Sequence, residues 1–226
     1  SCWYRDYHYV EDYFSRIHAA LHDGKPVCDL LVLNPIESVW ARAYSGSFDG
    51  LLGVDPEIIR LERQYAELFH ILSGNQIDFE YGEEDIMSRH GKVEEGILYV
   101  GSCAYRKVLV AGMDTMRSGT LALLEEFAAQ GGEVIFAGEV PGFVDVIPSD
   151  KVRLLADRCR RVAFEEEAVA RAAGSGMEVR ITPGDSGERG KDAAALGDIF
   201  VQSFEVDGGR MVMLLNVNRE RDYKDV

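Results

Sequence analysis

Short, nearly continuous apolar runs alternate along this chain with longer stretches in which apolar residues recur every three or four positions. The runs are typical of strands buried on both faces of a parallel sheet, and the longer stretches are typical of helices that cover such a sheet. Strands that alternate with helices predict an α/β protein with a doubly wound, mostly parallel sheet. We expect strands at Cys28–Leu33, Ile77–Tyr81, Ile97–Val100, Lys107–Ala111, Glu133–Ala137 and Met177–Ile181.

Capping and stop residues set the limits of the predicted helices. Asp55 followed by Pro56 is typical of a helix start, because the carboxylate caps the first turn and proline fits its first position. In the first predicted helix, we expect Ile17 and Leu21 to lie on a buried stripe. The predicted helices run from about Val10 to Leu21, from Pro56 to Gly74, from about Thr115 to Gly131, from Ser149 through Cys159 to Val162, and over about Glu165–Ala173.

The C-terminal part of the chain has a different pattern. Thr182–Asp192 is a polar, glycine-rich loop, and after it Ile199–Val206 and Met211–Val217 flank Asp207–Gly209. Two apolar strands around an Asp-Gly turn predict an antiparallel β-hairpin. We expect this hairpin to be added to the sheet edge or to lead into a following β domain.

Composition and charge narrow the classes of partner. The 226 residues carry a formal net charge of −15, which argues against nucleic acid and against anionic lipid. Apolar runs stay well below the ~20 residues of a membrane span. Four widely spaced cysteines (Cys2, Cys28, Cys103 and Cys159) lack a CxxC pair, so we expect reduced thiols and a cytoplasmic protein. Ser1 is followed at once by aromatic and charged residues, which we interpret as a boundary or processing site.

Cofactor and nucleophile motifs are missing where the predicted fold would place them. Leu33–Glu37 follows the first strand in place of a GxGxxG loop, and no GxxxxGK[ST] loop occurs. We therefore expect no cofactor. Gly101–Tyr105 has the outline of a nucleophile elbow, but Tyr105 is too bulky for its strained turn. His18 and His22 are one helical turn apart, and we expect solvent-exposed side chains there rather than a metal site.

An acidic stretch at 78–85 is the strongest candidate for chemistry in the chain. Asp78 and Glu80 alternate onto one face of a predicted strand, and Glu84 and Asp85 fall in the first turn of a short helix that ends at His90. Carboxyl groups in different environments could serve as an acid and base pair or bind a hard cation. They could equally complement the dipole at the helix N-terminus. Asp78 and Glu80 are the weak catalytic candidates, and Glu84, Asp85 and His90 are candidate ligand-binding residues.

Glu37 and Trp40 follow the first predicted strand at its carboxyl end, where ligands bind in open α/β sheets. A carboxylate beside an aromatic ring is suited to a sugar. The same tryptophan could instead pack into the core.

Five segments together resemble a region of large, multi-domain glycoside hydrolases. Tyr9–Ile17 and Leu21–Pro35 resemble the junction after the catalytic barrel, where a helix leads into an amidotransferase-like domain. Family 42 β-galactosidases, whose corresponding domain mediates trimerisation, and family 106 α-L-rhamnosidase-like enzymes share this arrangement. Leu33–Trp40 and Ile77–Met87 look most similar to the rhamnosidase-like group, and Leu214–Arg219 resembles the strand that leads into those enzymes' β-sandwich.

The resemblance implies a flavodoxin-like, class I glutamine amidotransferase-like domain at 26–182. It also implies a helix at 1–25 that links to an upstream catalytic barrel, and a loop and hairpin at 183–226. Because the amidotransferase nucleophile is missing, we expect a non-catalytic accessory or oligomerisation domain, which contacts carbohydrate only indirectly and can form a homo-oligomer. The alternatives are a self-sufficient hydrolase that uses the 78–85 stretch, or a carbohydrate-binding module that uses Glu37 and Trp40.

Overall fold

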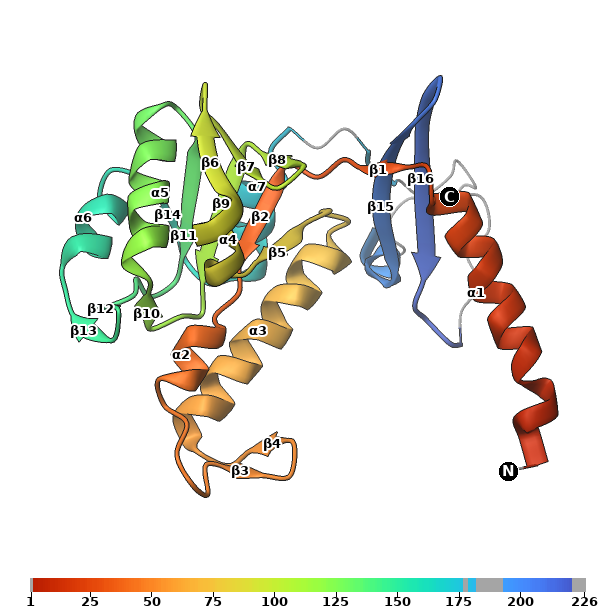
Figure 1. Ribbon diagram of the computed structural model, residues 1–226, viewed down its shortest axis with the longest axis horizontal. Coiled ribbons are helices and arrows are strands. Elements are labelled where there is room, and N and C mark those ends of the chain that lie inside the picture. The colour runs from red at the N-terminus through yellow and green to blue at the C-terminus, as the bar shows by residue number, and fades with distance from the viewer. Residues whose placement is uncertain (1, 177–178, 182–192, 221–226) are drawn as a thin grey trace.

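A five-stranded parallel sheet forms the centre of the computed structural model, which describes residues 2–176, 179–181 and 193–220 (Figure 1). From edge to edge, the strands are β14 (Arg160–Val162), β11 (Glu133–Ala137), β9 (Lys107–Ala111), β2 (Leu30–Leu33) and β5 (Glu80–Gly82). All four neighbouring pairs are parallel. The predicted α/β class with a mostly parallel sheet is therefore confirmed. Along the chain, β2 is the first strand of this sheet, β5 the second and β9 the third. Because β2 lies between β5 and β9, the direction of winding reverses between β2 and β9.

The central strands are buried on both faces, as their continuous apolar sequences predict. In β2, Leu31 and Leu33 belong to one hydrophobic cluster, whereas Leu30 and Val32 belong to a second cluster on the opposite face. All four side chains are at most 2% exposed. Each such burial stabilises the fold by about 1.5–3 kcal/mol before the entropy cost of ordering is subtracted.

Helices cover both faces of this sheet. α3 (Pro56–Gly74) and α7 (Glu166–Ala173) supply buried side chains to the cluster around Val32. The opposite face is covered by α4 (Glu84–His90), α5 (Ser118–Ala129) and α6 (Lys151–Ala156). Asp55 caps α3 as predicted, since its carboxylate accepts hydrogen bonds from the backbone amides of Glu57 at 2.9 Å and Ile58 at 3.3 Å.

Short elements surround the sheet. The predicted strand Ile97–Val100 exists as β7, but it pairs in a separate antiparallel sheet and not in the central one. The remaining short elements are η1 (Cys2–Asp6), α2 (Ile36–Trp40), β3 (Phe48–Asp49), β4 (Leu52–Gly53), β6 (Gly91–Glu94), β8 (Cys103–Tyr105), β10 (Thr115–Met116), β12 (Phe143–Val144), β13 (Ile147–Pro148) and η2 (Ala193–Asp198).

Three predicted boundaries are wrong. The helix expected from about Thr115 begins at Ser118, because Thr115–Met116 pairs with β12 as strand β10. The helix expected to continue through Cys159 to Val162 ends at Ala156, and Arg160–Val162 forms edge strand β14, because pairing with β11 overrides the helical spacing. The strand expected at Ile77–Tyr81 begins at Glu80. The strand expected at Met177–Ile181 is not formed at 179–181, and 177–178 lie outside the described residues, as does the Thr182–Asp192 loop.

The predicted C-terminal hairpin is confirmed as β15 (Ile199–Val206) and β16 (Gly209–Asn216). It pairs with β1 (Lys25–Pro26) in a sheet of its own, so it does not extend the central sheet. The hairpin stands beside the C-terminal part of α3 (Figure 1).

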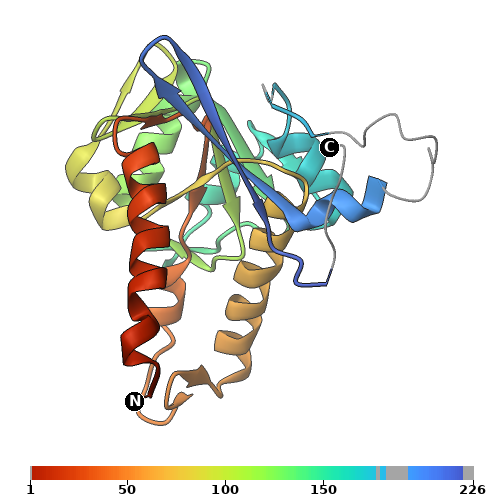
Figure 2. The same ribbon diagram turned by 90° about the vertical axis from the view of Figure 1, so that its right-hand side faces the viewer.

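The predicted first helix is present as α1 (Tyr7–Leu21), but its stripe is not buried. No residue of α1 is buried, although Ile17 and Leu21 are partly covered. Figure 2 shows the helix running along the outside of the molecule. None of the helices in the described ranges is long and apolar enough to span a bilayer. Cys28, Cys103 and Cys159 are free thiols.

Candidate functional site

The carboxyl ends of β2 and β9 meet where the winding of the sheet reverses, which is the usual ligand position in open α/β sheets. Helix α2 follows β2, and Gly112–Met116 follows β9. Ser38, which is 1% exposed on α2, joins the two segments because its hydroxyl accepts hydrogen bonds from the backbone amides of Asp114 at 2.9 Å and Thr115 at 3.2 Å.

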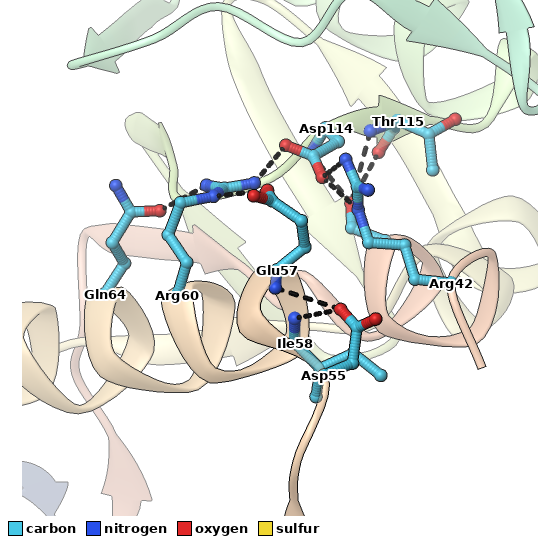
Figure 3. A network of polar contacts seen from close by, with 9 residues as sticks. Arg42, Asp55, Glu57, Ile58, Arg60, Gln64, Asp114 and Thr115 are labelled. Atoms are coloured by element: carbon cyan, nitrogen blue, oxygen red, sulfur yellow. Dashed lines mark hydrogen bonds and ion pairs between the residues drawn. The ribbon is translucent and has the colours of Figure 1, made fainter. Parts of the chain in front are cut away.

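Asp114 holds two arginines at this edge (Figure 3). Its carboxylate lies 2.7 Å from a guanidinium nitrogen of Arg42 and 2.7 Å from one of Arg60. Arg60 also donates to Glu57 at 3.0 Å and to Gln64 at 2.9 Å. A cavity of about 200 Å³ adjoins this network, and Glu139 and Phe143 are also among its lining residues. The positive charge that an anionic ligand would need is thus already paired with Asp114 and Glu57.

A second network surrounds Arg117. Its guanidinium lies 2.5 Å from Glu37 and 3.3 Å from Asp85, and its backbone amide donates to Glu84 at 2.9 Å. The structure therefore brings together three acidic residues that the sequence singled out separately. The Glu84 side chain is completely buried, and burial raises its pKa. Its Oε2 atom has no hydrogen-bond partner among the described residues.

The other two acidic candidates lie elsewhere. Asp78 precedes β5, at the amino end of the strand, and accepts a hydrogen bond from the backbone amide of Ser203 at 3.0 Å. Burial raises the pKa of Asp78 to about 6. Hydrogen bonds from the backbone amides of Ser203 and Phe79 act in the opposite direction, but their effect is smaller. Glu80 accepts a hydrogen bond from the hydroxyl of Tyr105. Only the later part of the acidic stretch, which includes Glu84 and Asp85, follows the carboxyl end of β5.

Trp40 and His90 are both on the surface. Trp40 is 59% exposed at the end of α2, which excludes the alternative that it packs into the core. His90 is the last residue of α4, and its Cα atom is about 9 Å along the helix axis from that of Glu84. The histidine therefore does not join the carboxylates around Arg117.

Sequence reasoning missed Arg42, Arg60, Asp114 and Arg117. The rule that pointed to Glu37 after β2 applies equally to Asp114 and Arg117, which follow β9, so this signal was present. Arg42 and Arg60 carry no comparable signal, because only the tertiary structure places them beside Asp114.

No protein-family model matches the chain, and no curated protein matches its sequence. Among solved structures, the chain is similar to Gan42B, a GH42 β-galactosidase, with a TM-score of 0.32 and 16% identity over 50% of this chain and 14% of that one. A catalytic mutant of Gan42B from G. stearothermophilus gives a TM-score of 0.36 and 14% identity over 54% of this chain and 15% of that one. The chain thus covers less than a sixth of either enzyme. A likeness this small assigns no function.

Proposed function

We propose that this chain is a non-catalytic, flavodoxin-like domain that supports the catalytic barrel of a larger glycoside hydrolase. The order of the central strands along the sheet, numbered by their order in the chain, is 2-1-3-4-5, which is the flavodoxin-like order. The sequence resemblance of Tyr9–Ile17 and Leu21–Pro35 supports the link to glycoside hydrolases.

The observation that carries this proposal is the exposure of α1. A surface helix of a globular protein normally buries its apolar face. In α1, by contrast, Phe14 is 61% exposed and Tyr9 is 67% exposed, and no residue of the helix is buried. Exposed apolar area of this kind is typical of an interaction surface. A neighbouring domain that packs on α1 would bury it, and a second copy of the chain could do the same in a homo-oligomer.

The test compares the chain alone with the longer polypeptide that includes the proposed barrel. We expect hydrolysis of aryl glycosides only by the longer polypeptide, and stronger protection of the α1 amides from hydrogen exchange there. Equal exchange of the α1 amides in both polypeptides would contradict the docking role.

A second candidate function, a self-sufficient hydrolase, is supported by the different surroundings of Asp78 and Glu80. The pKa of Asp78 is raised to about 6, whereas Glu80 is bound by the Tyr105 hydroxyl. Turnover of aryl glycosides by the chain alone, lost in both Asp78→Asn and Glu80→Gln, would favour this function over the accessory role.

A further inference from the structure

A cavity of about 310 Å³ lies between β5, α3 and the β15–β16 hairpin, away from the carboxyl edge of the sheet. Small-molecule pockets span about 300–1,000 Å³, so this cavity is at the lower end of their range. Its lining comes from α3, from the segment that leads into and forms β5, and from the hairpin. The lining residues include Phe69 and Ser73 of α3, then Ile77, Asp78, Phe79 and Tyr81, and Phe200, Gln202 and Leu215 of the hairpin.

Four aromatic rings contribute to the apolar part of this cavity, together with aliphatic side chains. The ring of Phe69 packs edge-to-face against Phe79 at 6.0 Å and against Phe200 at 5.8 Å. Phe79 in turn packs edge-to-face on Tyr81 at 5.2 Å. These four rings hold one another in place, yet each remains partly exposed. A ligand would therefore meet a preorganised aromatic surface.

Polar groups with hydrogen-bonding capacity to spare line the same cavity. The hydroxyl of Tyr81 is buried and has no hydrogen-bond partner in the described part of the chain. No described residue bonds the side-chain amide of Gln202, which lies partly exposed on the hairpin. Asp78 adds a carboxylate that accepts from the Ser203 backbone amide and can accept further hydrogen bonds. Buried polar groups that stay unpaired are costly, so an occupant that pairs them is favoured.

These two kinds of surface select the class of ligand. A purely apolar occupant would leave the Tyr81 hydroxyl and the Gln202 amide without partners and would add none to Asp78. A quaternary ammonium ion would pair with Asp78 and the rings, but it has neither a hydrogen-bond donor nor an acceptor for the amide of Gln202. A sugar ring presents C–H groups on one face and hydroxyl groups around its rim, so it can satisfy both.

We propose that this cavity binds one sugar residue, whose C–H face lies on the aromatic rings and whose hydroxyls bond to Gln202, Tyr81 and Asp78. Such a site gives the chain a carbohydrate ligand of its own, which the accessory role does not require.

The test is a titration of the 226-residue chain with methyl glycosides of galactose, rhamnose, glucose and mannose, followed by calorimetry and by saturation-transfer NMR. At least one glycoside should bind at millimolar concentration, with saturation transferred to its C–H protons from the aromatic rings. Gln202→Leu and Tyr81→Phe each remove one hydrogen-bonding group with little change in volume, and each should weaken binding about threefold to tenfold.

Matched variants far from the cavity serve as controls. Gln130→Leu, at the end of α5, and Tyr99→Phe, on β7, should leave the affinity unchanged. The proposal would be overturned if no glycoside bound, if tetramethylammonium or benzyl alcohol bound and the glycosides did not, or if both cavity variants bound like the parent chain. Loss of binding in Trp40→Ala alone would place the sugar at the carboxyl edge, and would also overturn it. None of these results bears on the accessory role, which rests on α1.

Discussion

Replacing Asp78 with asparagine should remove one defined contribution to the pH dependence of stability. The folded pKa of Asp78, about 6, lies above its ordinary value of 3.8 because the carboxylate is partly buried beside the hairpin. Between those two values, the folded state holds more protons than the unfolded state, so this group makes the protein less stable as pH rises. A pKa shift of this size corresponds to a loss of stability of at most about 3 kcal/mol between low and high pH. Solvent screening at a partly exposed site reduces this loss to about 1–2 kcal/mol.

The measurement is urea unfolding followed by circular dichroism at about pH 4 and about pH 8. Low protein concentration is needed because the sequence pI is about 4.7. Asparagine keeps an oxygen that accepts from the Ser203 amide, so Asp78→Asn should match the parent near pH 4 and be about 1–2 kcal/mol more stable near pH 8. Asp49→Asn, at an exposed position, should show the same stability difference from the parent at both pH values. If Asp78→Asn were less stable than the parent at pH 8, or showed the same pH dependence, the assigned cause would be wrong.

Three further changes test the carboxyl edge of the sheet by the same unfolding measurement. Asp114→Asn leaves Arg42 and Arg60 with weaker partners and should cost about 1–3 kcal/mol, whereas Asp157→Asn removes only an exposed ion pair and should cost less than about 1 kcal/mol. Ser38→Ala leaves the two backbone amides that donate to the Ser38 hydroxyl without a partner and should lower stability by about 1–3 kcal/mol. A change in stability near zero would contradict that account. Val146 has φ of 65° and is 58% exposed, so Val146→Gly should relieve strain and raise stability by about 1 kcal/mol; a destabilised variant would refute this.

The inner strands of the sheet were predictable because burial on both faces demands a continuous apolar run. β2, β9 and β11 all have such a run and lie where it predicts, within two residues. Edge strand β14 was missed because Arg160 and Arg161 face solvent, and only pairing with β11 makes the segment a strand. The same holds for the hairpin, whose turn was predictable although its partner strand β1 was not, since Lys25–Pro26 is too short to give a pattern.

The candidate site residues were likewise predictable only where their position in the sequence was sufficient. Position after a strand was enough to select Glu37 and Glu84, which the structure places around one arginine. It was not enough to select Arg60, whose relevance depends on the ion pair that the fold forms between α3 and Asp114, which follows β9. Asp78 was selected as part of the acidic stretch, but the strand begins at Glu80. Asp78 therefore lies before the strand, at the amino end of the sheet, away from Glu84 and Asp85.

The position of free hydrogen-bonding capacity decides which part of this molecule can take a ligand. At the carboxyl edge, a ligand anion would have to displace Asp114 from two arginines held at 2.7 Å, so its gain is offset by the loss of those ion pairs. In the cavity beside the hairpin, the Tyr81 hydroxyl and the Gln202 amide have no partner to lose within the described residues. A neutral polyhydroxylated ligand there exchanges hydrogen bonds with water for hydrogen bonds with the protein, and it breaks no ion pair such as those of Asp114. The hairpin therefore adds binding capacity that the usual ligand position of the sheet lacks.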